Sequence, residues 1–141
     1  HIYSEKCYNE KILKLLNITE CDYKLLDKNN NTFLHCLGNV NYDRLKDIVK
    51  KTLCIVDYQN NDGETILIKA IKNNNENLFY ILKGFNANMK IKDINGNTVY
   101  HYICHMGNCC GITIPFIENN YGYHPIDYCT ISTNYYNFIN I

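Results

Sequence analysis

Residues 93–101, DINGNTVYH, decide the fold of this 141-residue chain. Asp93 can accept hydrogen bonds from its own turn, and Gly96 follows where a positive φ costs little. Thr98 then stands in the position of a helix N-cap, directly before an apolar run that begins at Val99. The nine residues therefore predict a tight turn followed by a helix, and they raise the question of what His101 does.

The same pattern occurs at other places in the chain. Thr32, Thr65 and Thr98 lie 33 residues apart. Each belongs to one of three similar segments: DKNNNTFLH at 27–35, NNDGETILI at 60–68 and DINGNTVYH at 93–101. A fourth, weaker copy, NNYGYHPID at 119–127, begins 26 residues after the third instead of 33, which indicates a deletion before it.

Each copy continues with two short apolar runs, which predict two helices per copy. In the second copy the helices are expected at 66–71 and 78–82, separated by the polar break 73–75. The remaining expected helices are 33–38 and 45–51 in the first copy, 99–106 and a shortened 112–116 in the third, and a leading helix from Ser4 to about Asn17. Gly111 and Pro115 interrupt the shortened helix, so an irregular segment is expected there.

This period and order of elements resemble the ankyrin repeat, whose pattern runs D-x-x-G-x-T-P-L-H-x-A-A before a second helix. Residues 81–93, ILKGFNANMKIKD, look like the family's closing L-L-x-x-G-A-D-x-N-x-x-D, with Asn86 in the position of the left-handed glycine. The resemblance covers about residues 20–130. It implies an all-α ankyrin-repeat solenoid of about three to four repeats.

On this interpretation the chain is a single domain over residues 1–141. Its expected parts are a leading partial repeat (1–20), repeat 1 (21–53), repeat 2 (54–86), a shortened repeat 3 (87–118) and a C-terminal capping repeat (119–141). In the family the Thr hydroxyl and the His ring tie the inner helix to neighbouring backbone, which implies that His35 and His101 are structural.

Three departures from the family pattern affect the caps. No proline follows the threonine in the first three copies, and Ile68 replaces the histidine in the second. In the fourth copy His124 takes the threonine position and Asp127 the histidine position. Weaker capping is therefore expected in the second and fourth copies.

The composition excludes several partners. Fourteen Lys and Arg balance fourteen Asp and Glu, so no basic field is present to bind nucleic acid. No apolar run approaches the ~20 residues needed to cross a bilayer, so no membrane partner is expected. These features predict a soluble, cytoplasmic protein, with the nucleus as a second compartment. The eight cysteines are expected to be reduced and mainly buried in apolar faces.

Residues 101–110, HYICHMGNCC, are the one segment with metal-binding character. His101, Cys104 and His105 fall on one predicted helix face, with Cys109 and Cys110 close behind, so a zinc site is an alternative reading. No CxxC spacing occurs, and His101 already has a role in the turn. Neither a metal nor another cofactor is therefore expected. A Cys/His nucleophilic pair is disfavoured because no thiol has an electropositive, exposed setting, so we expect no enzyme.

The resemblance implies protein binding through turn tips and the inner-helix face. The predicted partner-binding residues are Asp62, Lys72, Ile94, Asn95, Tyr102, His105, Met106, Tyr121 and Tyr123. Further candidates are Lys28, Asn29, Asn61 and Asn120 at the turn tips and Lys69 on the inner-helix face. Ordinary solvated turns would also explain Lys28, Asn29, Asn61 and Asp62. The exposed Ile94, Tyr121 and Tyr123 are the sharpest candidates. The alternative is that the irregular junction folds the two tyrosines inward.

The excess of Asn, Lys, Ile and Tyr indicates an A/T-rich genome. Short ankyrin proteins with this composition resemble those of large DNA viruses, which implies a modulator of host innate signalling, either a mimic of the Rel/NF-κB inhibitor or a cullin ubiquitin-ligase adaptor. The end of the chain soon after the fourth copy favours the stand-alone binder, a monomer or weak dimer. Because the chain begins at His1 without a methionine, a fragment of a larger ankyrin protein stays an alternative.

Overall fold

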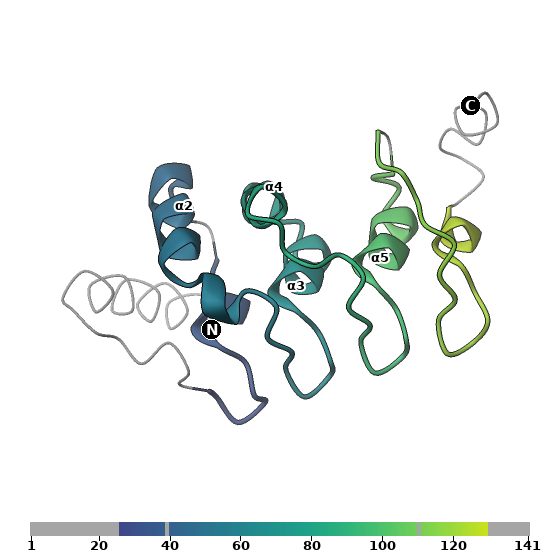
Figure 1. Cartoon of the computed structure of the whole chain (residues 1–141), viewed down its shortest axis with the longest axis horizontal. Helices are drawn as coiled ribbons and strands as arrows, with labels where there is room; N and C mark the ends of the chain where they lie inside the picture. Colours follow the sequence, from purple (N-terminus) through teal and green to yellow (C-terminus); the bar gives the residue numbers. More distant parts are fainter. Residues whose placement is uncertain (1–25, 39, 110, 130–141) are drawn as a thin grey trace. The chain divides into compact units, whose positions relative to one another are not determined.

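The structure, a computed structural model, describes residues 26–38, 40–109 and 111–129. These ranges form helices and no β-sheet (Figure 1), which confirms the predicted all-α class for this part of the chain. The elements are the 3₁₀ helices η1 (Phe33–Cys36), η2 (Leu53–Ile55) and η3 (Pro125–Tyr128) and the α-helices α2 (Tyr42–Lys51), α3 (Ile66–Lys72), α4 (Glu76–Gly84) and α5 (Val99–His105). The chain divides after Asn88 into two compact units. The expected helix from Ser4 to Asn17 lies outside the described residues.

Four turns share one hydrogen-bonding pattern. In each, the side-chain oxygen of the first residue accepts the backbone N–H groups two and four positions later, at 2.8–3.0 Å. These first residues are Asp27, Asn60, Asp93 and Asn119. The fourth residue of each turn has a positive φ: 59° at Asn30, 70° at Gly63, 75° at Gly96 and 78° at Gly122. The turns predicted from the sequence are therefore confirmed, including the weak fourth copy.

An extended, capping residue follows each turn and begins a helix. Thr32, Thr65 and Thr98 are almost completely buried, at 1%, 1% and 0% exposed. The Thr65 hydroxyl oxygen accepts the N–H of Ile68 at 3.3 Å. The three threonines thus occupy equivalent environments at the starts of η1, α3 and α5.

His101 completes the cap of α5. Its Nδ1 accepts the backbone N–H of Thr98 at 3.0 Å and lies 3.0 Å from the Thr98 hydroxyl. Its Nε2 then carries the proton and donates to the carbonyl of Tyr123 in the next turn, at 3.2 Å. The ring is 2% exposed, so both of its nitrogens are satisfied inside the protein. His101 is therefore an architectural residue.

His35 makes the equivalent bonds in the first unit. Its Nδ1 accepts the N–H of Thr32 at 3.2 Å, and its Nε2 donates to the carbonyl of Glu64 at 3.0 Å. In the second copy Ile68 has no ring nitrogen, so the Thr65 hydroxyl alone caps α3. In the fourth copy the Asp127 carboxylate accepts the N–H of His124 at 2.7 Å, a charge-assisted bond. The weaker capping expected in this copy stays a prediction.

The first unit buries its apolar side chains between helices. Helix α3 packs against α4 and η1, and α2 packs against α4 (Figure 1). Leu34, Val49, Ile66 and Leu82 are fully buried in this core. The chain leaves α4 through Asn86, whose φ of 61° confirms the left-handed position predicted there.

Two helix boundaries in this unit differ from the predictions. Helix η1 ends at Cys36 instead of residue 38, because Leu37 is extended and Gly38 disfavours a helix. Helix α2 begins at Tyr42 instead of residue 45, because the side chain of Asn41 accepts the N–H of Asp43 at 3.1 Å and supplies an earlier N-cap.

In the second unit α5 packs against η3. The shortened helix expected at residues 112–116 is wrong, since residues 112–119 have no helical structure. Gly111 has a φ of 73°, and Pro115 lacks the N–H that a helix interior needs, so the segment is irregular.

We expect the change His101→Ala to lower the free energy of unfolding by about 1–3 kcal/mol, because it leaves the Thr98 N–H and the Tyr123 carbonyl without their buried partner. Urea unfolding followed by circular dichroism measures the difference. His105→Ala, at an exposed position of the same helix, is the control and should change stability by less than about 0.5 kcal/mol. Equal effects of the two changes would contradict the structural role of His101.

The two buried histidines predict a stability that falls with acid. Burial lowers the pKa of His35 and of His101 below the ordinary value of 6.5. The unfolded chain therefore takes up protons first, and the stability contributed by the neutral rings, complete above about pH 6.5, is lost as the pH falls through the folded-state pKa.

The measurement is the free energy of unfolding between about pH 8 and about pH 5, for the wild type and for His35→Gln, whose amide does not titrate. We expect a shallower fall in the variant. Glu64 and Asp27, whose carboxylates lie near His35, have pKa values lowered from 4.5 and 3.8, so they act at lower pH. An identical fall in both proteins would show that His35 is not buried in its neutral form.

Candidate functional site

The sharpest predicted binding residues meet on one surface of the second unit, which we term the turn-tip surface and define as Ile94, Asn95, Asn120 and Tyr121. The Asn120 N–H donates to the Asn95 carbonyl at 3.0 Å, and the Asn120 side chain donates to the Ile94 carbonyl at 2.9 Å. The Tyr121 hydroxyl donates to the Asn95 side chain at 3.2 Å. Ile94 and Tyr121 are nevertheless 61% and 65% exposed. The surface is thus held by polar bonds and presents apolar groups.

A second bond ladder lies beneath this surface. The Asn119 amide donates to the side chain of Asn97 at 2.7 Å and to the hydroxyl of Tyr128 at 2.8 Å. Together with the His101 bond to Tyr123, these contacts join the third and fourth turns at three levels. The exposed side chains of the turn-tip surface therefore project from backbone that internal hydrogen bonds already hold in place.

Aromatic rings extend the exposed area beyond the turn tips. Tyr123 is 54% exposed, and its ring centroid lies 6.0 Å from that of Tyr128 in an edge arrangement. His105 is also exposed, with its ring 6.2 Å from Tyr128, and Met106 follows it at 37% exposed. The alternative in which the tyrosines fold inward is therefore wrong for Tyr121 and Tyr123.

Three other predicted residues are occupied by internal bonds or lie elsewhere. The Tyr102 hydroxyl donates to the Asp93 carboxylate. Lys72 forms an ion pair with the buried Glu64, while Asp62 is exposed at the tip of the second turn, in the first unit. Lys72 and Tyr102, predicted as binding residues of the inner-helix face, thus make internal bonds to residues of the turns.

The setting of Glu64 shows how the first unit tolerates a buried carboxylate. Burial alone would raise the pKa of Glu64, but the hydrogen bond and charge of Lys72 bring it below its ordinary value of 4.5. Lys69 Nζ, 3.7 Å from the carboxylate, adds to this effect. The group is therefore ionised and paired at neutral pH.

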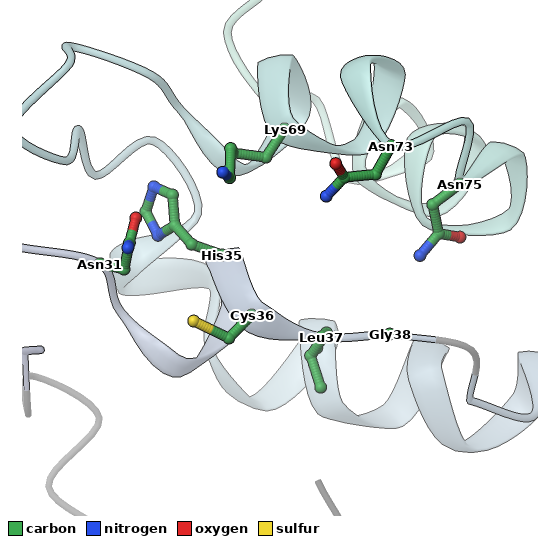
Figure 2. Close-up of a pocket in the computed structure, with 8 residues that line it drawn as sticks. All are labelled: Asn31, His35, Cys36, Leu37, Gly38, Lys69, Asn73 and Asn75. Atoms are coloured by element: carbon green, nitrogen blue, oxygen red, sulfur yellow. The ribbon is translucent and has the colours of Figure 1, made fainter. Parts of the chain in front are cut away.

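A polar groove of about 480 Å³ lies in the first unit (Figure 2). Figure 2 shows Lys69, Asn73 and Asn75 on one wall, with their side chains directed toward the chain from His35 to Gly38. Asn31 closes one end. Lys69 belongs to the predicted inner-helix face, so the groove continues that face.

Sequence reasoning missed several of these residues. In the sequence, Asn31, Asn73 and Asn75 stand out only as residues that favour turns. Asparagine occurs in many turns of this chain, so these three positions could not be recognised as part of a groove. Phe116, expected in a helix, is 83% exposed, with its ring 3.5 Å from that of His124 in a stacked arrangement. No periodicity marks Phe116, because the segment that holds it is irregular.

The set of possible zinc ligands that lie close together differs from the set considered in the sequence. His101 is committed to the turn, the His105 ring packs against Tyr128, and Cys110 lies outside the described residues. Cys104 and Cys109 are buried and are joined by Cys129, which the sequence did not single out. The three sulfur atoms all lie within 4.8 Å of one another.

These thiols are unsuited to nucleophilic catalysis. Burial raises the pKa of Cys104 and of Cys109, and the nearby Cys129 adds to the rise in both. Both are therefore neutral thiols at physiological pH, whereas the reactive form is the thiolate. The described cysteines Cys54, Cys104, Cys109 and Cys129 are free thiols, as expected, although Cys54, like Cys36, is exposed and not buried.

No protein-family model and no curated protein matches this chain. The longest helix in the described ranges, α2, has ten residues, about half of what a bilayer-spanning helix requires.

The turn-tip surface depends on the close approach of Gly96 to the next turn. A Cβ atom at Gly96 would lie 2.7 Å from the backbone nitrogen of Asn120, whereas one at Gly122 would meet nothing within 4 Å. Both glycines have a φ near the same positive value, 75° and 78°.

We therefore expect Gly122→Ala to cost about 1 kcal/mol through its backbone conformation, and Gly96→Ala to cost at least about 1 kcal/mol more. Thermal and urea unfolding compare the two variants. If Gly96→Ala is no worse than Gly122→Ala, the two turns do not pack as described.

Proposed function

We propose that this protein is a non-catalytic module that binds a partner protein through its turn tips and inner-helix face. The observation that carries the proposal is the turn-tip surface, where exposed Ile94 and Tyr121 side chains stand on turns fixed by internal hydrogen bonds. The fold we propose for it is the ankyrin-repeat solenoid. Four turns with one hydrogen-bonding pattern, at the spacing noted in the sequence, support this fold.

Binding by this surface is favourable for two physical reasons. Apolar and aromatic side chains supply most of the energy at protein interfaces, and both Ile94 and Tyr121 are available for burial. The backbone beneath them is already ordered, so association does not have to order the turns first. A flexible loop with the same residues would lose more conformational entropy on binding.

The polar chemistry of the described residues supports binding rather than catalysis. The two buried histidines use both ring nitrogens in turns, and the buried Glu64 is neutralised by lysines. The buried thiols Cys104 and Cys109 are protonated. These buried groups are thus engaged in structure or protonated at neutral pH.

For the partner, the resemblance to short viral ankyrin proteins favours a host signalling protein, with a Rel/NF-κB-type factor as the first to be tested. The apolar and tyrosine-rich character of the turn-tip surface fits a protein partner with an apolar patch. The balanced charge of the chain argues against nucleic acid as the ligand.

We expect Ile94→Asp and Tyr121→Ala each to weaken partner binding by at least about tenfold, because each removes an anchor from the contact surface. Calorimetry with a purified Rel-type DNA-binding domain is the first measurement, and capture from host-cell lysate the second. Unfolding temperatures should stay within about 3 °C of wild type, since both side chains are exposed.

Tyr80→Ala is the matched control, because Tyr80 is also 61% exposed but lies on α4, in the first unit. It should leave binding unchanged. Absence of binding to the Rel-type domain would reject that partner alone. Unchanged capture of every lysate partner by both turn-tip variants would reject the proposed surface.

A further inference from the structure

Three separate segments of the second unit bring a cysteine to one point. Cys104 lies in α5, Cys109 lies in the loop after it, and Cys129 is the C-cap residue of η3. Twenty residues separate Cys109 from Cys129, yet their sulfur atoms are 3.5 Å apart. Only the packing of α5 against η3 makes this arrangement.

The spacing of the sulfur atoms fits a bound metal ion better than a covalent link. Thiolates around a tetrahedral zinc ion, with Zn–S bonds of ~2.3 Å, stand ~3.8 Å from one another. The three sulfur atoms here lie within 4.8 Å of one another, and the closest pair is at 3.5 Å. A shift of a few tenths of an ångström to about one ångström, within reach of χ1 adjustments, would bring all three to zinc distance.

A cross-link would stabilise the described part of the second unit. The helix expected over residues 112–116 is missing, and the buried apolar side chains described in this unit are Val99, Ile103, Cys104 and Cys109, with Pro125. A core this small supplies little stability, and small units with thin cores commonly rely on a metal or disulfide.

We propose that Cys104, Cys109 and Cys129 together bind one zinc ion, which fastens the irregular segment and the last turn to α5. Three sulfur ligands select a soft or borderline metal ion and exclude Mg²⁺ and Ca²⁺, which require oxygen. A water molecule completes the tetrahedron. On binding, each thiol releases its proton to the solvent and its sulfur becomes a thiolate ligand.

The test uses the whole chain, purified with a non-thiol reductant. Metal content is measured after incubation with zinc and removal of free metal, and cobalt(II) is added separately as a spectroscopic probe. We expect about one zinc per chain and, with cobalt, the thiolate charge-transfer and tetrahedral absorption bands of a sulfur-rich site. A strong chelator should lower the unfolding temperature of the zinc-loaded protein.

Substitutions identify the ligands. Cys129→Ser, at a partly exposed position, should weaken zinc binding by at least about 100-fold, and Cys104→Ser should do the same. Cys54→Ser is the control, because Cys54 is exposed and lies in the first unit, and it should bind zinc like the wild type. If Cys104→Ser does not fold, the Cys129→Ser result decides.

The proposal is overturned if the reduced wild type binds no zinc and gives no cobalt thiolate bands. It is also overturned if Cys129→Ser binds zinc as tightly as Cys54→Ser. A Cys109–Cys129 disulfide in the reduced, zinc-treated protein, found by mass spectrometry, would likewise replace the metal site with a covalent link. If neither ligand variant folds, the wild-type cobalt spectrum alone settles the matter.

Discussion

A single side-chain oxygen organises each turn of this protein. Asp27, Asn60, Asp93 and Asn119 each satisfy two backbone N–H groups that would otherwise lack partners inside a tight loop. The turn closes only because its fourth residue adopts a positive φ, which Gly or Asn does at low cost. The other features depend on this turn, because it sets the direction of the helix that follows and the position of the residues at its tip.

Histidine converts these separate turns into a stacked structure within each unit. His35 and His101 each cap their own helix with one nitrogen and reach the next turn with the other. Burial keeps the rings neutral, and neutrality is what allows one nitrogen to accept while the other donates. The exposed side chains of the turn-tip surface therefore project from turns whose polar groups are already hydrogen-bonded within the protein.

The second unit obtains its stability differently from the first. Among the described residues, the first buries Leu, Ile and Val side chains between α2, α3 and α4, whereas residues 112–119 of the second form no helix and Cys104 and Cys109 are among its buried side chains. Thiols are small enough to fill the space next to α5, and three of them in contact also form a ligand set. The chain around Pro115 is irregular and leaves Phe116 exposed. Without a helix in this segment, fewer apolar side chains are buried and more apolar surface is exposed. Packing and surface are thus linked in this unit.

The amino-acid sequence alone determined the four turns, the capping threonines, the left-handed Asn86 and the inner helices, because these depend on hydrogen bonds between residues at most four or five positions apart. Prediction of the exposed Ile94 and Tyr121 succeeded for the same reason, since the register of a turn dictates which side chains point outward. Tertiary structure decided the rest. The bonds of His101 and His35 to the next turn, the groove beside Lys69 and the meeting of Cys109 with Cys129 join segments far apart along the chain. The bonds of Lys72 to Glu64 and of Tyr102 to Asp93 span eight and nine residues, which is still beyond one helical turn. No local pattern encodes such distances, because they arise only when helices pack.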